Sequence, residues 1–151
     1  MAIQYPSYLP GVLLDSYGIQ TVEPMQRTQM DSGRARQRRR FTNVPQMVTV
    51  GWVFTQQEAA LFEAWHRWEL KDGAEWFEIE LSTPYGYQPY LCRFTRIYQG
   101  GKPFAVIDWT HSAELEIKER KTLPVEYLAA QEFVLNSDLF DLAVNQEWPE
   151  A

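Results

Sequence analysis

A cluster of arginines near the start of the chain has the clearest chemical potential. Five of the seven residues from 34 to 40 are arginine, namely Arg34, Arg36, Arg38, Arg39 and Arg40. Planar guanidinium groups bind carboxylates and phosphates through paired hydrogen bonds. We therefore expect these five residues to form interface contacts with acidic groups of neighbouring subunits. A solvated loop and a nucleic-acid contact are the alternatives.

The remainder of the chain is acidic. The 151 residues include 14 Lys and Arg and 20 Asp and Glu, which gives a formal charge of −6. Six of the basic residues lie from Arg27 to Arg40, so the other eight are set against 20 acidic residues and leave −12. This asymmetry favours self-association, because the basic segment of one copy can meet the acidic surface of another. Phe41 is the only aromatic residue beside the cluster, which leaves little surface for stacking a nucleic-acid base.

Three carboxylates are the nearest approach to a catalytic pattern. Glu75, Glu78 and Glu80 are close enough in sequence to supply the carboxylate pair of a glycosidase. Glu78 and Glu80 alternate with apolar residues at the two-residue period of a strand, namely Phe77, Ile79 and Leu81. This alternation predicts that the two carboxylates lie on the solvent-facing side of the strand. The sequence has neither a phosphate-binding glycine loop nor a nucleophile elbow. We expect no catalytic residues and no enzymatic activity.

The sequence has few histidine or cysteine residues that could bind a metal ion or a cofactor. His66 and His111 are the only histidines, and Cys92 is the only cysteine. Structural zinc sites take three or four Cys and His ligands at short spacings, and no such set occurs. We therefore expect no metal, no cofactor, no disulfide within the chain, and two structural histidines whose ring nitrogens are hydrogen-bonded.

A strand followed by a helix is the most regular pattern in the chain. Residues 46–54 place four large apolar side chains on one face at the two-residue period of a strand: Val48, Val50, Trp52 and Phe54. Thr55 and Glu58 match a capping box, which predicts a helix over residues 55–71. Its expected apolar face is broad and carries Leu61, Trp65 and Trp68, with Phe62 and Leu70 alongside.

Alternation predicts three more strands, at residues 77–81, 90–95 and 105–118. Turns are expected at 83–86 and at Gly100–Gly101. The result is a mainly β fold with one α-helix in an antiparallel meander. We expect residues 25–121 to form this core domain.

The segments on either side of the core have a different character. Residues 1–24 contain three prolines and predict an extended N-terminal arm with one or two short strands. Residues 31–43 predict an Arg-rich loop or the tip of a hairpin. Neither a signal peptide nor an apolar run of roughly 18 residues occurs, so we expect no membrane contact and assembly in a reducing cytoplasm.

Residues 122–151 predict a C-terminal docking tail. They carry apolar side chains without a strand pattern, and we expect four of them to contact a partner: Phe133, Leu139, Phe140 and Trp148. A short helix is expected from Ser137 through Asn145. The alternative is that the segment folds back onto its own subunit.

Three patterns in sequence order carry a resemblance to a known family. The first is a polar Ser-Gly segment with spaced arginines at residues 32–38, and the second is a strand leading into a capped helix at residues 48–58. The third is a glycine followed by a Phe-bearing strand and a Pro turn, at residues 73–84. In these features the segment 22–119 resembles the minor tail proteins of long-tailed bacteriophages, which occupy the tail tip.

The resemblance implies both a fold and an assembly. It implies an antiparallel β-sandwich of the tail-tube type with a flanking helix, arranged as a homo-oligomeric six-fold or three-fold ring around the tail axis. Other phage tail proteins are then the partners, the virion tail is the location, and direct nucleic-acid contact is transient or absent. The alternative position in the particle is that of a head–tail connector or a tail-completion subunit. A DNA-binding module that uses the Arg-rich segment is the alternative of another class.

Overall fold

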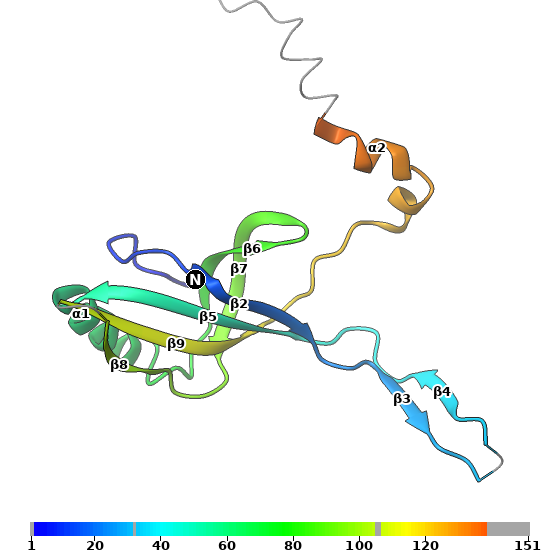
Figure 1. Ribbon diagram of the computed structural model, residues 1–151, viewed down its shortest axis with the longest axis horizontal. Helices are drawn as coiled ribbons and strands as arrows, with labels where there is room; N and C mark the ends of the chain where they lie inside the picture. Colours follow the sequence, from blue (N-terminus) through cyan, green and yellow to red (C-terminus); the bar gives the residue numbers. More distant parts are fainter. Residues whose placement is uncertain (1, 32, 105–106, 139–151) are drawn as a thin grey trace, which may run out of the picture. The chain divides into compact units, whose positions relative to one another are not determined.

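The computed structural model describes residues 2–31, 33–104 and 107–138. The chain divides into two compact units, Met1–Arg120 and Lys121–Ala151. The first unit is mainly β with one long helix, as the sequence predicts (Figure 1). Within the described part of the chain, no helix is both long and apolar enough to cross a membrane.

Seven strands of the first unit form one mixed sheet in the order β1-β6-β7-β9-β5-β2, with β8 also paired to β9. Strand β9 pairs along its length with β5 on one edge, and its other edge is shared by β8 and β7. The described sheet is open, because no pairing joins β1 to β2. The strands are β1 (Ile3–Gln4), β2 (Leu13–Thr21), β5 (Gln46–Thr55), β6 (Phe77–Thr83), β7 (Gly86–Phe94), β8 (Gln99–Phe104) and β9 (Asp108–Ile117).

The helix α1 (Gln56–Trp68) begins at the predicted capping box. The backbone N–H of Thr55 donates to Oε2 of Glu58 at 2.8 Å, and the N–H of Glu58 donates to Oγ1 of Thr55 at 3.4 Å. These two bonds satisfy amides that have no partner within a helix. They fix the point at which strand β5 becomes helix.

The buried face of α1 differs from the predicted one. Leu61 and Trp68 are exposed, at 48% and 73%, and the buried helix residues are Ala59, Phe62, Trp65 and His66. Phe62, Trp65 and Leu70 are buried as predicted, while Leu61 and Trp68 at the other side of the expected face are not. The centre of the buried face is thus rotated from the i, i+4, i+7 stripe by about one residue, or roughly 100°. The helix turns so that the ring of Phe62 contacts Trp52 and Phe54 of strand β5.

The glycine pair at 100–101 lies within strand β8 rather than in the predicted turn. The pairing register of β8 with β9 shifts between Gly100 and Lys102, which is a bulge. A Cβ atom on Gly100 would lie 2.3 Å from Cδ2 of His111, so a glycine allows the backbone to approach that ring. The strand predicted over residues 105–118 corresponds to β9, which runs from Asp108 to Ile117.

The segment after α1 depends on a glycine with a left-handed backbone. Gly73 has φ +87°, and a Cβ there would lie 3.1 Å from Cβ of Phe94 and 3.0 Å from Nε2 of His66. We expect Gly73→Ala to lower the free energy of unfolding by about 1–3 kcal/mol, measured by chemical denaturation. Gly18→Ala is the control, because that site on edge strand β2 has no atom within 4 Å of the added carbon. An equal loss in both variants would contradict this explanation.

The core lies between the sheet and α1, and it includes the single cysteine. Cys92 is fully buried, and burial raises the pKa of its thiol to about 12. At about pH 8 the thiolate fraction is then on the order of one in ten thousand. We expect no labelling of the folded chain by a maleimide and complete labelling after denaturation, as measured by mass spectrometry. Rapid labelling of the folded chain would contradict the burial of this strand.

The second unit contains two short helical turns among its described residues. They are a 3-10 helix, η1 (Val125–Leu128), and the helix α2 (Gln131–Leu135). The side chain of Gln131 donates to the carbonyl of Leu128 at 2.9 Å, which links the two turns. None of the residues of η1 or α2 is buried.

Candidate functional site

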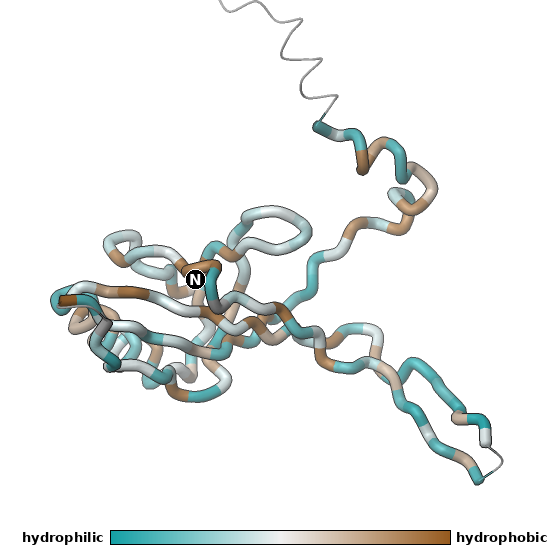
Figure 2. The backbone as a smooth tube through the Cα atoms, viewed as in Figure 1, coloured by the Kyte–Doolittle hydropathy of each residue, from teal (hydrophilic) through white to brown (hydrophobic). Residues whose placement is uncertain are grey.

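The arginine cluster lies on a two-stranded hairpin. Strand β3 (Met25–Thr28) pairs with β4 (Arg36–Arg39), and the two make a separate sheet. Of the two predicted forms, loop or hairpin, the structure therefore has the hairpin, with arginines along one of its strands. The tube of Figure 2 is mostly hydrophilic along this ribbon. An isolated two-stranded hairpin is marginal in water, so outside contacts would stabilise it.

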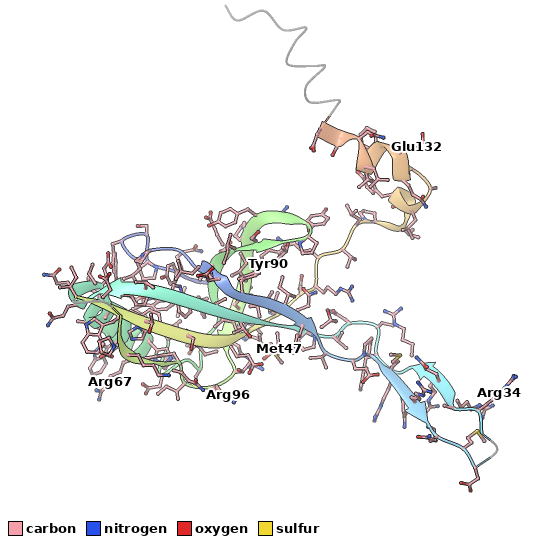
Figure 3. All side chains as sticks on the ribbon, in the orientation of Figure 1. Arg34, Met47, Arg67, Tyr90, Arg96 and Glu132 are labelled. Carbon is pink, nitrogen blue, oxygen red and sulfur yellow. The ribbon has the colours of Figure 1, made fainter. Side chains whose placement is uncertain are left out.

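The base of the hairpin is anchored to the main sheet. The amides of Arg40 and Phe41 both donate to the carbonyl of Pro24, at 2.8 and 3.1 Å. The amide of Val22 donates to the carbonyl of Pro45 at 3.3 Å, directly after the pairing of β2 with β5. The hairpin thus continues the β2–β5 pair outward, and Figure 3 shows Arg34 toward its far end.

Both faces of the hairpin carry positive charge. The register pairs Met25 with Arg39 and Gln26 with Arg38, so these pairs stand on opposite faces. Alternation then places Arg36 on the same face as Arg38, and Arg27 on the same face as Arg39. Every residue of β4 is exposed.

The arginines of the cluster differ in what they already bind. Arg39 donates from Nε to the carbonyl of Phe41 at 3.0 Å and from Nη2 to that of Thr42 at 2.8 Å. The guanidinium of Arg40 lies over the Phe41 ring, 5.2 Å from its centroid. Arg38 makes one long contact, 3.4 Å, to Oε1 of Gln26. Arg39 and Arg40 therefore have local roles.

No carboxylate of the described residues neutralises the hairpin. Three ion pairs join described residues, and none includes a hairpin arginine. The side chains of Arg27, Arg34 and Arg36 have neither a hydrogen bond nor an ion pair to another described residue. The cations that remain for an outside partner are therefore Arg27, Arg34, Arg36 and Arg38.

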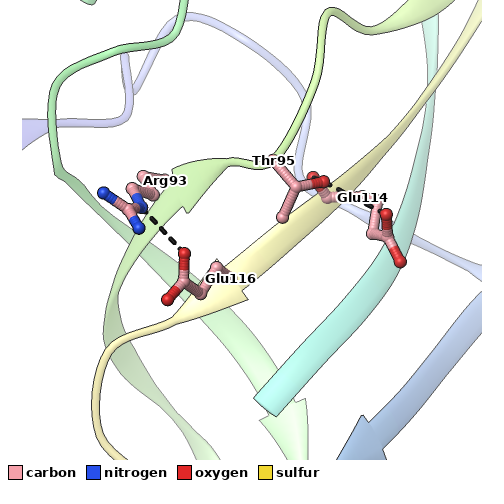
Figure 4. A network of polar contacts seen from close by, with 4 residues as sticks. All are labelled: Arg93, Thr95, Glu114 and Glu116. Carbon is pink, nitrogen blue, oxygen red and sulfur yellow. Dashed lines mark hydrogen bonds and ion pairs between the residues drawn. The ribbon is translucent and has the colours of Figure 1, made fainter. Parts of the chain in front are cut away.

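Arg93 on the main sheet, by contrast, has a carboxylate partner within the chain (Figure 4). It donates from Nε to Oε2 of Glu116 at 2.8 Å, and nearby Thr95 donates to Oε2 of Glu114 at 3.1 Å. The guanidinium of Arg93 also lies 4.7 Å from the ring centroid of Trp76. A carboxylate is thus within reach of this arginine of the sheet, whereas none pairs with the hairpin arginines among the described residues.

The predicted solvent side of strand β6 borders a cleft. Phe77, Ile79 and Leu81 are buried as predicted, and Glu78 and Glu80 alternate with them. Glu78 accepts a hydrogen bond from Nε2 of Gln4 at 2.7 Å. A hydrogen bond to Glu80 raises the pKa of Tyr87. Glu75 lies apart and pairs with Lys71 at 2.6 Å. The three carboxylates thus do not form one site.

The two histidines are buried together in an aromatic cluster. His66 on α1 and His111 on β9 are each 3% exposed. Their rings pack against a shared pair of aromatic side chains, Phe62 and Tyr98. Burial agrees with the predicted structural role, but Nε2 of His66 and both ring nitrogens of His111 lack a hydrogen-bond partner in the described structure. Among the described residues, no three Cys, His, Asp or Glu side chains are grouped to hold a metal.

Burial lowers the pKa of both histidines. Asp72 opposes this shift at His66. The backbone of Trp109 and the carboxylate of Glu63 oppose it at His111. A neutral imidazole is therefore the folded form of each, and a proton on either ring would be held in an apolar environment.

The C-terminal candidates are only partly within the described structure. Phe133 lies on α2 and is 53% exposed. Leu139, Phe140, Trp148 and most of the predicted helix from Ser137 lie outside the described residues.

No protein-family model matches this chain. No curated protein matches it either.

Proposed function

We propose that this chain is a structural subunit of a long-tailed phage tail, which assembles as a six-fold or three-fold ring at the tail tip. The observation that carries the proposal is the exposed hairpin, whose arginines have no carboxylate partner among the described residues. A charged ribbon of this kind gains most by binding an acidic surface of another subunit. The acidic remainder of the same chain offers such a surface.

The resemblance in residues 22–119 supports the phage assignment. The curved mainly β unit, with α1 on one side, is compatible with a relative of the tail-tube β-sandwich. In this proposal residues 122–151 contact adjoining tail proteins. Deletion of these residues is then expected to leave the folded first unit intact and to abolish incorporation into tails.

Cryo-electron microscopy of the phage particles tests the proposal. We expect the chain to build into a closed ring around the tail axis, with each hairpin contacting a neighbouring subunit. A ring at the opposite end of the tail would favour the connector or tail-completion role. Absence of the chain from mature particles would overturn the structural role.

A DNA-binding module is the second candidate, because the hairpin has arginines on both faces. Phosphate contacts weaken steeply with salt, with a log–log slope of about −0.9 for each contact on duplex DNA. Fluorescence anisotropy with duplex DNA at about 50 and 200 mM salt distinguishes the candidates. The structural role predicts negligible binding at the higher salt. Tight binding there, lost on reversal of the hairpin charges, would favour the DNA module.

A further inference from the structure

We infer that strand β4 of one copy docks in the cleft beside strand β6 of a second copy, with Arg36 and Arg38 bound to Glu78 and Glu80. The inference rests on the proposed assembly function and identifies the acidic surface that receives the hairpin. Three observations carry it: the shape of the cleft, the open edge of β6, and the matched spacing of the charges.

The cleft has a volume of about 390 Å³ and lies between residues 4–12 and the β6–β7 pair. Its walls are mixed, with aromatic and apolar side chains beside the polar Gln4 and Ser7, and its only charged lining residues are Glu78 and Glu80. The aromatic rings are those of Tyr5 and Tyr87. Neither Lys nor Arg lies among the described residues of this lining. Ring faces beside carboxylates suit a guanidinium, which can stack and donate hydrogen bonds together.

The edge of β6 along the cleft is open. Strand β1 pairs with β6 only at Phe77 and Glu78, and the amide of Tyr5 donates to the carbonyl of Glu78 at 2.9 Å. Because backbone groups alternate along a strand, the N–H and C=O of Glu80 and Ser82 face this same edge. No described strand pairs with β6 there beyond Glu78. Such an edge accepts an added extended segment, and β4 is one.

The spacing of the charges matches. Glu78 and Glu80 are two residues apart on one face of β6, and Arg36 and Arg38 are two residues apart on one face of β4. Two residues of strand span roughly 6.7 Å in both cases. A strand laid along β6 can therefore form both ion pairs at once. Arg39 and Arg40 are not required, because their guanidinium groups have local contacts.

The carboxylates of the cleft can exchange partners at low cost. Among the described residues of one copy, their donors are neutral: the Gln4 amide at Glu78 and the Tyr87 hydroxyl at Glu80. Charge-assisted hydrogen bonds from guanidinium groups are about twice as strong as those from neutral donors. Within one chain, neither Arg36 nor Arg38 forms an ion pair with Glu78 or Glu80. In the proposed contact the arginines therefore come from a second copy.

Reversal and exchange of these charges in the full chain test the inference by sedimentation velocity. We expect Arg36→Glu with Arg38→Glu to lower the association constant at least about tenfold, and Glu78→Arg with Glu80→Arg to do the same. All four substitutions together are expected to restore association to within about threefold. Arg67→Glu on the exposed face of α1 and Glu69→Arg at its C-cap are matched controls, and we expect no effect from them on association. Circular dichroism checks that each variant is folded.

Three outcomes would overturn the inference. Normal association after reversal of Glu78 and Glu80, with loss after reversal of the arginines, would reject this cleft and leave the assembly function in place. Failure of the fourfold exchange to restore association would reject these ion pairs. A parent chain that stays monomeric at every concentration would contradict both the inference and the assembly function.

Disulfide capture provides an independent readout. Arg38→Cys together with Glu80→Cys or Glu78→Cys is expected to give covalent oligomers on mild oxidation, while each single substitution does not. The buried Cys92 does not compete. An absence of covalent oligomers from both pairs, under conditions in which the chain associates, would reject the contact.

Discussion

Replacing Phe62 with alanine is expected to lower the free energy of unfolding by about 3–5 kcal/mol. Phe62 is fully buried, and its ring centroid lies 5.4 Å from that of Trp52, 5.0 Å from Phe54 and 5.2 Å from Tyr98. Removal of the ring leaves a cavity where α1, β5 and the segment before β8 meet. A loss of this size is a large share of the roughly 5–15 kcal/mol that stabilises an ordinary domain.

Urea denaturation followed by tryptophan fluorescence measures the effect of the Phe62 substitution. Leu61→Ala is the matched control on the adjacent helix position, because its side chain is 48% exposed. We expect the control to change stability by no more than about 0.5 kcal/mol. Equal losses in the two variants would contradict the exposure of Leu61 and hence the orientation of the helix on the sheet.

Acidification is expected to destabilise the first unit through His66 and His111. Both have a pKa below the ordinary value of 6.5 in the folded chain, so near that pH the unfolded state binds more protons. The free energy of unfolding is therefore highest, as far as these two rings are concerned, above about pH 6.5, and it falls as the pH drops below that value. Each extra proton bound by the unfolded state changes the free energy of unfolding by about 1.4 kcal/mol per pH unit. The two rings together therefore give a slope of at most about 2.7 kcal/mol per pH unit.

Denaturation midpoints between about pH 7.5 and pH 5 measure this slope. The variant with His66→Leu and His111→Leu is the control, and we expect it to flatten the dependence in this range. Acidic side chains that titrate at lower pH remain in that variant, so any residual slope belongs to them. An equally steep decline in the variant would show that the histidines do not cause the acid sensitivity.

Local patterns in the sequence predict most of the first unit. The strand through Val50, the capping box at Thr55 and the alternation of Phe77, Ile79 and Leu81 each depend on neighbours within a few residues, and each is confirmed. The rotation of α1 is not a local property. The broad predicted face contains both Leu61 and Phe62, and packing against β5 buries Phe62 and leaves Leu61 exposed.

Strand β8 could not be predicted for a related reason. Gly100 and Gly101 are turn-forming residues by composition, but the ring of His111 across the sheet requires a residue without Cβ at position 100. That requirement comes from a residue eleven positions away. The sequence also could not predict that ring nitrogens of the two buried histidines lack a hydrogen-bond partner among the described residues. The spacing of residues along the chain reveals neither the burial of a side chain nor which donors and acceptors lie near it.

Charge density alone identified the arginine segment, but its division of roles required the structure. The carbonyls near Arg39 and the ring beside Arg40 are local features that a count of charges does not reveal. The prediction that Glu78 and Glu80 lie on a solvated face agrees with the structure, in which Glu78 is half-buried and Glu80 is exposed beside the buried apolar residues of β6. The proposed contact adds one feature of the sequence to this face, since the two carboxylates have the same two-residue spacing as Arg36 and Arg38.

The distribution of arginines on the hairpin also restricts the symmetry with which copies can associate. In a two-fold contact of hairpin against hairpin, arginines of one copy would face arginines of the other. The ribbon carries arginines on both faces, so neither face escapes this repulsion. The hairpin therefore has to meet a different surface, and in the proposed assembly that surface is the cleft beside β6. Two copies that exchange this contact form a two-fold dimer, whereas a heterologous contact runs from each copy to the next. Repetition of one heterologous contact builds a closed ring or an open filament, and the rotation from copy to copy decides which one forms.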